Sequence, residues 1–187
     1  MASRLWLITA AVFAAAALLA WPVAKPLLLW HPDQLWRAFT APLAHLSFQH
    51  LVANLAGCAA LGWLGHAARL PARASIAWWL AWPLTQWGLL VRPELQSYGG
   101  LSGVLHAGVA VVVVELLGRQ SRRERWIGVG LLLGLLLKLW MDDPLGPVAQ
   151  VRDGWDIPIA PFAHLSGAVS GALAGGLMRA FAPRLKR

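Results

Sequence analysis

The sequence predicts an all-α membrane protein, built as a compact bundle of six transmembrane helices. Hydrophobic residues make up 58% of its 187 residues and charged residues only 13%, whereas soluble domains are about a quarter charged. The apolar residues run continuously, without the alternation that is typical of membrane β-barrels. Basic residues gather at the ends of these runs, so the net charge of +8 indicates membrane topology and not nucleic acid as a partner.

Six continuous apolar stretches divide the chain. In order they cover residues 5–29, 44–66, 74–91, 101–117, 126–141 and 161–181. A helix rises 1.5 Å per residue and needs about 20 residues to span a bilayer, so the first, second and sixth stretches are long enough. The other three are short and need a thinned bilayer or buried ends. Residues 1–187 are therefore expected to form a single membrane domain.

The loops predict the orientation of the bundle. Placing the N-terminus in the cytoplasm puts 11 of the 16 basic residues on that side. They are Arg4, Arg69, Arg73, Arg119, Arg122, Arg123, Arg125, Arg179, Arg184, Lys186 and Arg187. This excess agrees with the positive-inside rule, so both termini are predicted to be cytoplasmic. The first stretch should remain as an uncleaved span, because Pro22–Pro26 offers no clean signal-peptidase site.

Two segments on the opposite, outer side are too polar to cross a bilayer. Trp30–Ala44 interleaves apolar with polar side chains, which favours a short amphipathic segment in the outer interface. Asp142–Pro161 is rich in Gly, Pro and Asp and is expected to be a mobile loop.

Ser102 is the first candidate for chemistry. It lies between Gly100 and Gly103, at the outer start of the fourth stretch. The glycines allow another backbone to come close, and a helix N-terminus offers free N–H groups to developing negative charge. Taken alone, the motif is better explained by tight helix packing.

His164 opens the sixth stretch and so enters from the same side as Ser102. Small residues spaced by four, Ala163, Gly167, Gly171 and Gly175, follow one face of this stretch. The fourth stretch offers Gly103 and Ala107 at the same spacing. If these faces meet, Ser102 and His164 lie on adjoining helices at similar depth. An interfacial histidine beside a packing motif is the alternative.

Two further side chains share this depth, and a third lies one turn below it. His50 and Asn54 are four residues apart on one face of the second stretch, where they could donate hydrogen bonds to an oxyanion next to Ser102. Interhelical hydrogen bonding is their alternative role. His106, one turn below Ser102, either supports His164 or is a second candidate base, and the supporting role is favoured. His45 is expected to brace a loop.

No metal or other cofactor is expected. The chain has no His-Glu-x-x-His motif and no acidic residue at mid-membrane, which argues against a zinc site built from its histidines. Glu115 and Lys138 fall near the ends of stretches and are expected to extend to water. The glycines before Ser102 also lack the Gly-Lys-Ser/Thr ending of a phosphate-binding loop.

As a set, these motifs resemble the rhomboid family of intramembrane serine proteases. The matching segments are Trp36-Arg37, His45-Leu-Ser-Phe-Gln-His50-Leu-Val-Ala-Asn54, Gly100-Leu101-Ser102-Gly103, and Ala163-His164 with Gly167 and Gly171. Each motif is modest, but their order and their placement on the predicted spans make the set specific.

The resemblance implies a catalytic dyad without an acid. Ser102 would attack the peptide carbonyl, His164 would take and return the proton, and the Ser102 N–H, His50 and Asn54 would meet the oxyanion. His106 stands where many members have tyrosine, four residues after the serine. That substitution is similar to the rhombosortase branch, which implies a membrane-anchored protein substrate with a C-terminal Gly-Gly tail. It also implies a bacterial inner-membrane protein whose active site faces the periplasm.

Two other functions remain open at this point. An inactive rhomboid-like protein would bind membrane helices without cutting them, although the intact serine, histidine and asparagine set argues against it. A transporter or channel subunit would need mid-membrane carboxylates and repeated halves, and the sequence shows neither.

Overall fold

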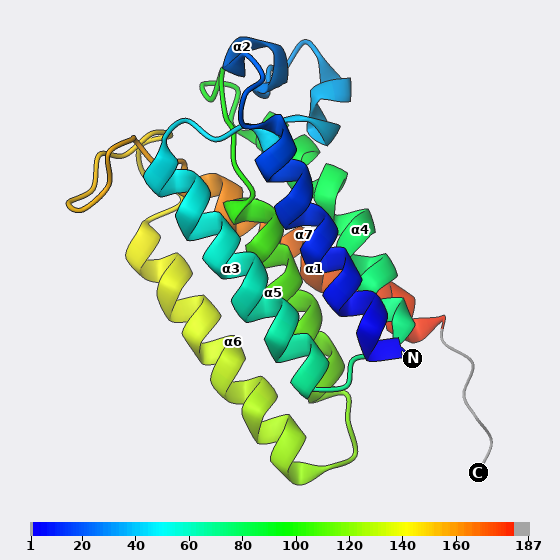
Figure 1. Ribbon diagram of the computed structural model, residues 1–187. Coiled ribbons are helices and arrows are strands. Elements are labelled where there is room, and N and C mark those ends of the chain that lie inside the picture. The colour runs from blue at the N-terminus through cyan, green and yellow to red at the C-terminus, as the bar shows by residue number, and fades with distance from the viewer. Residues whose placement is uncertain (1, 182–187) are drawn as a thin grey trace.

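The computed structural model describes residues 2–181, and the regular secondary structure in that range is helical, with two isolated β-bridges and no β-strand (Figure 1). The long helices are α1 (Ala2–Ala20), α3 (Phe48–Ala67), α4 (Ala72–Trp87), α5 (Ser102–Leu117), α6 (Arg122–Asp142) and α7 (Pro161–Ala180). Four short helices connect them: α2 (Lys25–Leu28), η1 (Leu35–Phe39), η2 (Ala41–Leu43) and η3 (Gly88–Val91). The all-α prediction is confirmed.

The boundaries differ from the predicted stretches where local chemistry decides them. α1 ends at Ala20 and not at residue 29, because Pro22 cannot continue a helix. α3 begins four residues later than predicted, since the Ser47 side chain accepts a hydrogen bond from the His50 N–H and caps the helix. α6 begins four residues earlier than predicted, after Ser121 caps it through the Glu124 N–H.

Length and composition alone identify one helix in residues 2–181 as able to cross a membrane, at Ser3–Ala20 within α1. Ser102–Leu117 in α5 is apolar but shorter. The third to fifth stretches were expected to be short. The second and sixth were expected to be long enough, and their helices α3 and α7 have 20 residues each, but these two are not apolar enough to pass the same test.

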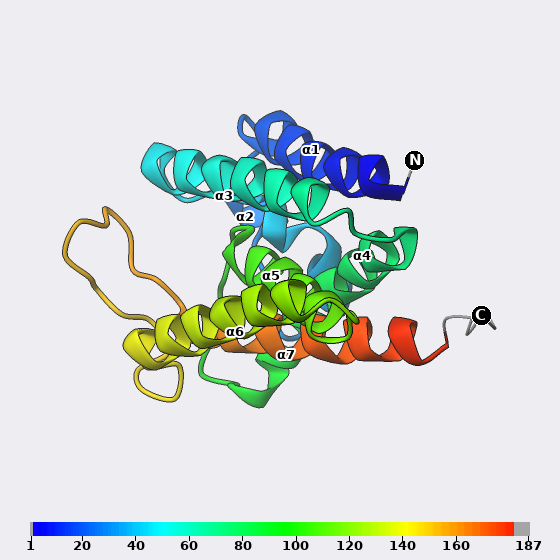
Figure 2. The same ribbon diagram turned by 90° about the horizontal axis from the view of Figure 1, so that it is seen from below.

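α5 lies at the centre of the bundle. It packs against α7, α6, α4 and α3, while α1 packs against α3 and α4. Seen along the bundle, α5 lies between α3 on one side and α7 on the other (Figure 2). An aromatic cluster fills the space between α1 and α4, where Trp6 stacks on Trp78 at 4.4 Å and Phe13 meets the Trp78 ring edge-on at 4.9 Å.

The contact between α5 and α7 is the closest in the fold, and it positions the site. A Cβ on Gly167 would lie 1.9 Å from the Gly103 carbonyl oxygen, and one on Gly171 would lie 2.1 Å from the Ala107 carbonyl oxygen. The two small-residue faces anticipated in the sequence therefore meet, with backbone against backbone.

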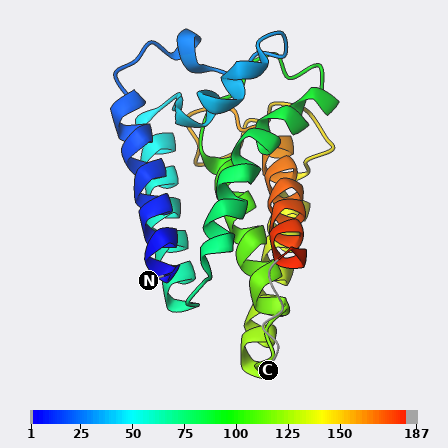
Figure 3. The ribbon, with the colours of Figure 1, turned by 90° about the vertical axis from the view of Figure 1, so that its right-hand side faces the viewer.

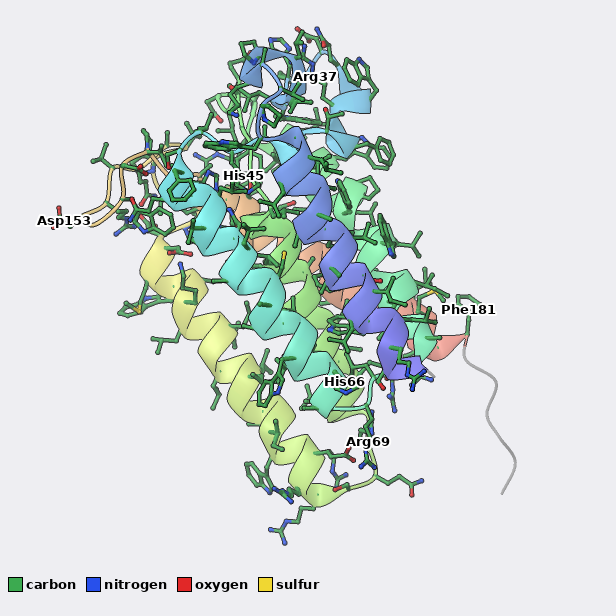
Figure 4. The ribbon with its side chains drawn as sticks, viewed as in Figure 1. Arg37, His45, His66, Arg69, Asp153 and Phe181 are labelled. Carbon is green, nitrogen blue, oxygen red and sulfur yellow. The ribbon has the colours of Figure 1, made fainter. Side chains whose placement is uncertain are left out.

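At one end of the bundle, α2, η1 and η2 form a cap (Figure 3). Trp30–Ala44, expected as one amphipathic segment, contains two short 3₁₀ helices, η1 and η2, joined by irregular chain. Arg37 in η1 connects this segment to the region of α2 by donating to the carbonyl oxygens of Pro26 and Leu29, at 2.7 and 2.9 Å. Figure 4 shows Arg37 and His45 at this end and His66 and Arg69 at the opposite end.

The long connection between α6 and α7 projects from the side of the bundle, with Asp153 at its outer edge (Figure 4). It is predicted to be mobile, yet it is attached to the start of α3. Ser47 donates to the Asp156 carboxylate at 2.7 Å, and the Gln49 amide donates to the Gly154 carbonyl at 2.6 Å. The loop therefore bridges α6, α3 and α7.

Glu115 corrects one expectation from the sequence. It does not extend to water, because it is 1% exposed. Arg73 on α4 pairs with its carboxylate at 2.7 Å, and Arg179 on α7 approaches at 3.6 Å. This group fastens α4, α5 and α7 together at the end of the bundle opposite the cap.

Candidate active site

Ser102 is the first residue of α5, directly after a glycine whose conformation is unusual. Gly100 has a φ of +117°, which residues with a side chain rarely adopt. A Cβ there would also lie 2.4 Å from the His50 ring. The Gly100 N–H donates to the Ala41 carbonyl at 3.0 Å. Glycine at this position thus lets α3, η2 and the start of α5 converge on Ser102.

His164 lies in the first turn of α7 and faces Ser102 across the close helix contact. Its Nε2 is 3.0 Å from the Ser102 Oγ, within the range for proton transfer between a base and a hydroxyl. The structure therefore brings together the two side chains that the sequence placed at the same depth.

The second nitrogen of the His164 ring contacts an acidic residue that the sequence analysis did not select. Nδ1 is 2.8 Å from the Asp142 Oδ2, and both side chains are more than nine-tenths buried. The resemblance implied a dyad without an acid, whereas the structure places a carboxylate against the second nitrogen of the His164 ring. Lys138, one turn earlier on α6, donates to the other carboxylate oxygen, while about half of its side chain (51%) stays exposed as expected.

These contacts determine which ring nitrogen of His164 carries the proton. An ionised carboxylate only accepts hydrogen bonds, so the hydrogen lies on Nδ1. Nε2 is then unprotonated and accepts the hydrogen of the Ser102 hydroxyl. This is the tautomer that a general base for serine requires.

His106 supports the same ring from below. Its imidazole stacks on His164 with ring centroids 4.2 Å apart and planes 10° apart. The Ser102 carbonyl, which can only accept, lies 2.7 Å from the His106 Nδ1, so Nδ1–H donates and its orientation is fixed. His106 thus contacts the Ser102 carbonyl and the His164 ring, as the supporting role that the sequence favoured would require.

Tyr98 is a second residue that the sequence analysis did not select as a site residue. Its hydroxyl donates to the Gly100 carbonyl at 3.1 Å and lies 3.2 Å from the Ser102 Oγ. The Gly103 N–H donates back to it at 3.4 Å. Burial raises the pKa of Tyr98, so the phenol stays neutral and holds the turn that carries Ser102.

His50 and Asn54 lie beside this turn, on α3. A Cβ on Gly100 would lie 2.4 Å from the His50 Nε2 and 3.7 Å from the Asn54 Nδ2. The Asn54 amide also donates to the His50 carbonyl at 3.0 Å. His45 lies against the His50 ring, with centroids 4.9 Å apart, and donates to the Leu43 carbonyl at 3.0 Å. Burial lowers the pKa of His45, which keeps it neutral in its bracing position.

A cavity of about 710 Å³ joins these groups. The polar side chains that face it include Ser102, His164, Asp142, His50, Asn54 and His106. Its apolar lining includes Leu46, Leu95, Met141 and Ile159. A concave, mainly apolar cavity with a few convergent polar groups is typical of a ligand or substrate site.

The cluster of His106, Asp142 and His164 brings its ligand atoms within 4.8 Å of one another. A metal ion must lie in the plane of each imidazole that binds it. The two rings are stacked almost parallel, so no point within ligand distance of both rings lies in both planes. In this arrangement the cluster suits a chain of hydrogen bonds better than a metal ion.

Comparison with known families agrees with the geometry. Residues 32–181, about four-fifths of the chain, match the model of the rhomboid domain. The chain belongs to the rhomboid family. A comparison with curated proteins finds no match. As a rhomboid, the chain is an integral membrane protein, and the family comprises proteases that act on transmembrane substrates together with inactive relatives.

The sequence of this rhomboid contains only weak indications that Asp142 and Tyr98 belong to the site. Asp142 follows the fifth apolar stretch directly, on the side where Ser102 and His164 lie, and Lys138 precedes it by one helical turn. That depth and spacing could have marked it as a partner for His164. Tyr98 is the only tyrosine in the chain and lies four residues before Ser102, but nothing in the sequence shows that the turn folds back onto it.

Proposed function

We propose that this chain is an intramembrane serine endopeptidase in which Ser102 is the nucleophile and His164 the general base. The observation that carries the proposal is the 3.0 Å contact between the Ser102 Oγ and the His164 Nε2. Both groups face one cavity, and His164 is held in the tautomer that can accept a proton.

The chemistry follows from these positions. The Ser102 oxygen forms a bond to the carbonyl carbon of the scissile peptide while its proton passes to the His164 Nε2. When the tetrahedral intermediate collapses, the C–N bond breaks and His164 gives this proton to the leaving amine. Water then attacks the acyl-enzyme, again with His164 as base, and releases Ser102.

Hydrogen bonds from the Ser102 N–H, His50 and Asn54 would stabilise the oxyanion. The N–H lies at the start of α5, where helix N–H groups have no partner within the helix. His50 and Asn54 face the same cavity and approach the turn before Ser102. Gly100 and Gly103 have no side chains and leave room for a substrate backbone beside the nucleophile. The backbone must come this close for the oxyanion to reach its hydrogen-bond donors.

In the membrane we place residues 1–187 as a single domain of six spans, with both termini cytoplasmic and the site toward the periplasm of a bacterial inner membrane. The six long helices in residues 2–181 coincide with the six apolar stretches of the sequence, and basic residues favour the end opposite the site. Three of those basic residues, Arg184, Lys186 and Arg187, lie outside the described part of the chain.

The substrate would be a membrane-anchored protein cut near the outer end of its span, with a C-terminal Gly-Gly tail as the favoured class. A transmembrane helix bonds its own backbone, so the scissile peptide must unwind locally before it can reach Ser102. A second cavity of about 500 Å³ lies between α3, α5 and α6 and shares Leu105, His106 and Lys138 with the first. This supports entry of the substrate beside α6 and below the loop that follows it.

The test is cleavage of a membrane-anchored Gly-Gly-tailed protein by the purified chain in liposomes. Ser102→Ala and His164→Ala should each abolish cleavage while the helical circular dichroism signal is unchanged, because the pair acts as a unit. A fluorophosphonate probe should label the wild-type chain and not Ser102→Ala. Substantial cleavage by either folded variant would reject the assignment.

The alternative is an inactive relative that binds membrane helices. It predicts no fluorophosphonate labelling together with retained binding of the same substrate. His106 provides a further check on the base. If His106→Ala is inactive while His164→Ala still cleaves, then His106 and not His164 is the base.

The substrate class has its own test. Replacing Gly-Gly by Leu-Leu at a fixed membrane position should slow cleavage, since glycine weakens a helix by about 1 kcal/mol per residue relative to alanine and its small size lets the backbone approach Ser102. Equal cleavage of both forms would show that the enzyme does not select its substrate by low helix stability or small side-chain size.

A further inference from the structure

We infer that Asp142 is the third member of the proton-transfer chain, a positioning residue that orients His164 and stabilises its charged form. The inference rests on the proposed function and goes beyond the Ser–His dyad that the family resemblance implies. It begins from the buried contact between the Asp142 Oδ2 and the His164 Nδ1, at 2.8 Å.

Both oxygens of the Asp142 carboxylate have a hydrogen-bond partner. Its second oxygen accepts from Lys138, which keeps a positive charge beside it. The Asp142 backbone carbonyl accepts from Arg152 at 3.0 Å. The side chain is 8% exposed, so the contact with His164 is shielded from water. A buried, charge-assisted hydrogen bond of this kind is shorter and stronger than one between neutral groups.

The other acidic residues near this end of the bundle do not offer the same contact. Asp143, Glu94 and Asp153 are exposed, and Asp156 accepts from Ser47 on α3. Among the described residues, Asp142 is therefore the carboxylate that is bonded to the ring of His164. Asp142 and Ser102 contact the two different nitrogens of the His164 ring, so the three side chains form one continuous chain of hydrogen bonds.

Three consequences for the reaction follow from this chain of hydrogen bonds. With its hydrogen bonded to Asp142, the Nδ1 of His164 cannot be the basic nitrogen, so Nε2 is presented to the Ser102 hydroxyl. When Nε2 takes the serine proton, the new positive charge lies next to a fixed negative charge. Asp142 stays ionised throughout and gains no proton. The stacked ring of His106 supplies no negative charge.

The test compares Asp142→Asn with Asp143→Asn in the full chain in liposomes. Asparagine keeps the size of the side chain and removes the charge, and it can donate to Nδ1 and so favour the wrong tautomer. Asp143 is exposed and lies in a left-handed conformation (φ 50°), which asparagine also tolerates. It is therefore a matched control on the next residue of the chain.

For Asp142→Asn we expect kcat to fall by about 100-fold or more, up to the roughly 10⁴-fold loss that the same change causes in soluble serine proteases. KM should stay within about twofold, because a residue that acts only in the transition state lowers kcat alone. Asp142→Glu should recover part of the loss, since it restores the charge. Asp143→Asn should cleave like the wild type.

A spectroscopic readout separates this role from a structural one. The hydrogen shared by His164 and Asp142 should give a low-field proton resonance in the wild type and in Ser102→Ala, and none in Asp142→Asn. The inference is overturned if Asp142→Asn keeps its kcat within about threefold, if Asp143→Asn loses as much, or if the resonance survives in Asp142→Asn. If the wild type neither cleaves nor labels, the proposed function fails, while the resonance still decides whether the two side chains are paired.

Discussion

The close contact of α5 and α7 makes the effect of one methyl group predictable. In Gly167→Ala the new Cβ would lie 1.9 Å from the Gly103 carbonyl oxygen. Ordinary van der Waals contact begins at 3.4 Å, so the two helices must separate locally by about 1.5 Å (3.4 − 1.9). The obstacle is a backbone carbonyl in the first turn of a helix and cannot rotate aside as a flexible side chain would.

That displacement acts directly on the site. Ser102 precedes Gly103 on α5, and His164 precedes Gly167 by one turn on α7. Their contact of 3.0 Å would lengthen toward about 4.5 Å, beyond the reach of a hydrogen bond. A misplacement of about 1 Å can cost 10²-fold in rate, so kcat should fall by at least about 100-fold. Overpacking should also lower the stability by about 1–3 kcal/mol.

Cleavage in liposomes and thermal unfolding in detergent measure the two effects. The controls are Gly175→Ala, where the nearest atom lies 3.4 Å from the new Cβ, and Gly176→Ala, where no atom lies within 4 Å. Both change the same helix by the same group and should cleave like the wild type. If Gly167→Ala matches Gly176→Ala in rate and in Tm, the helices do not depend on this contact and the reasoning is wrong.

Three other variants test single contacts. Asn54→Ala should lower kcat by about 10- to 100-fold without abolishing it, because one of several oxyanion donors is lost; an unchanged kcat contradicts that role. Tyr98→Phe leaves the Gly100 carbonyl without its donor and should destabilise the fold by about 1–3 kcal/mol in thermal unfolding. Glu115→Gln leaves Arg73 without its charged partner, and we expect a loss of about 1–3 kcal/mol, below that of a fully buried pair because the arginine reaches solvent. An unchanged Tm in either of these two variants contradicts its prediction.

The helices could be predicted from the sequence because apolar runs and their breaks are local properties. Six stretches were marked, and a long helix begins within four residues of the start of each. The errors came from side chains that act at helix ends. Ser47 and Ser121 cap α3 and α6, and Pro22 stops α1 nine residues before its apolar stretch ends.

The pairing of Ser102 and His164 could be anticipated for a different reason. Each residue lies at the start of a small-residue face, and faces of this kind allow close helix contact. The sequence therefore indicated both the depth of the two side chains and the contact that joins them. Glu115 was misjudged because its distance along the helix suggested water, while its partners, Arg73 and Arg179, come from two other helices.

Asp142 was not selected from the sequence because its position depends on one residue of helix. The fifth apolar stretch ends at residue 141, and with that boundary Asp142 is the first residue of an exposed loop, one acid among several. In the structure α6 includes Asp142 and ends only when Asp143 turns left-handed, at φ 50°. This extra residue keeps the carboxylate on the helix, one turn after Lys138 and against His164. Hydropathy locates where a span loses its apolar character, but the end of the helix is set by backbone conformation, and here that difference decides whether the histidine has an acidic partner.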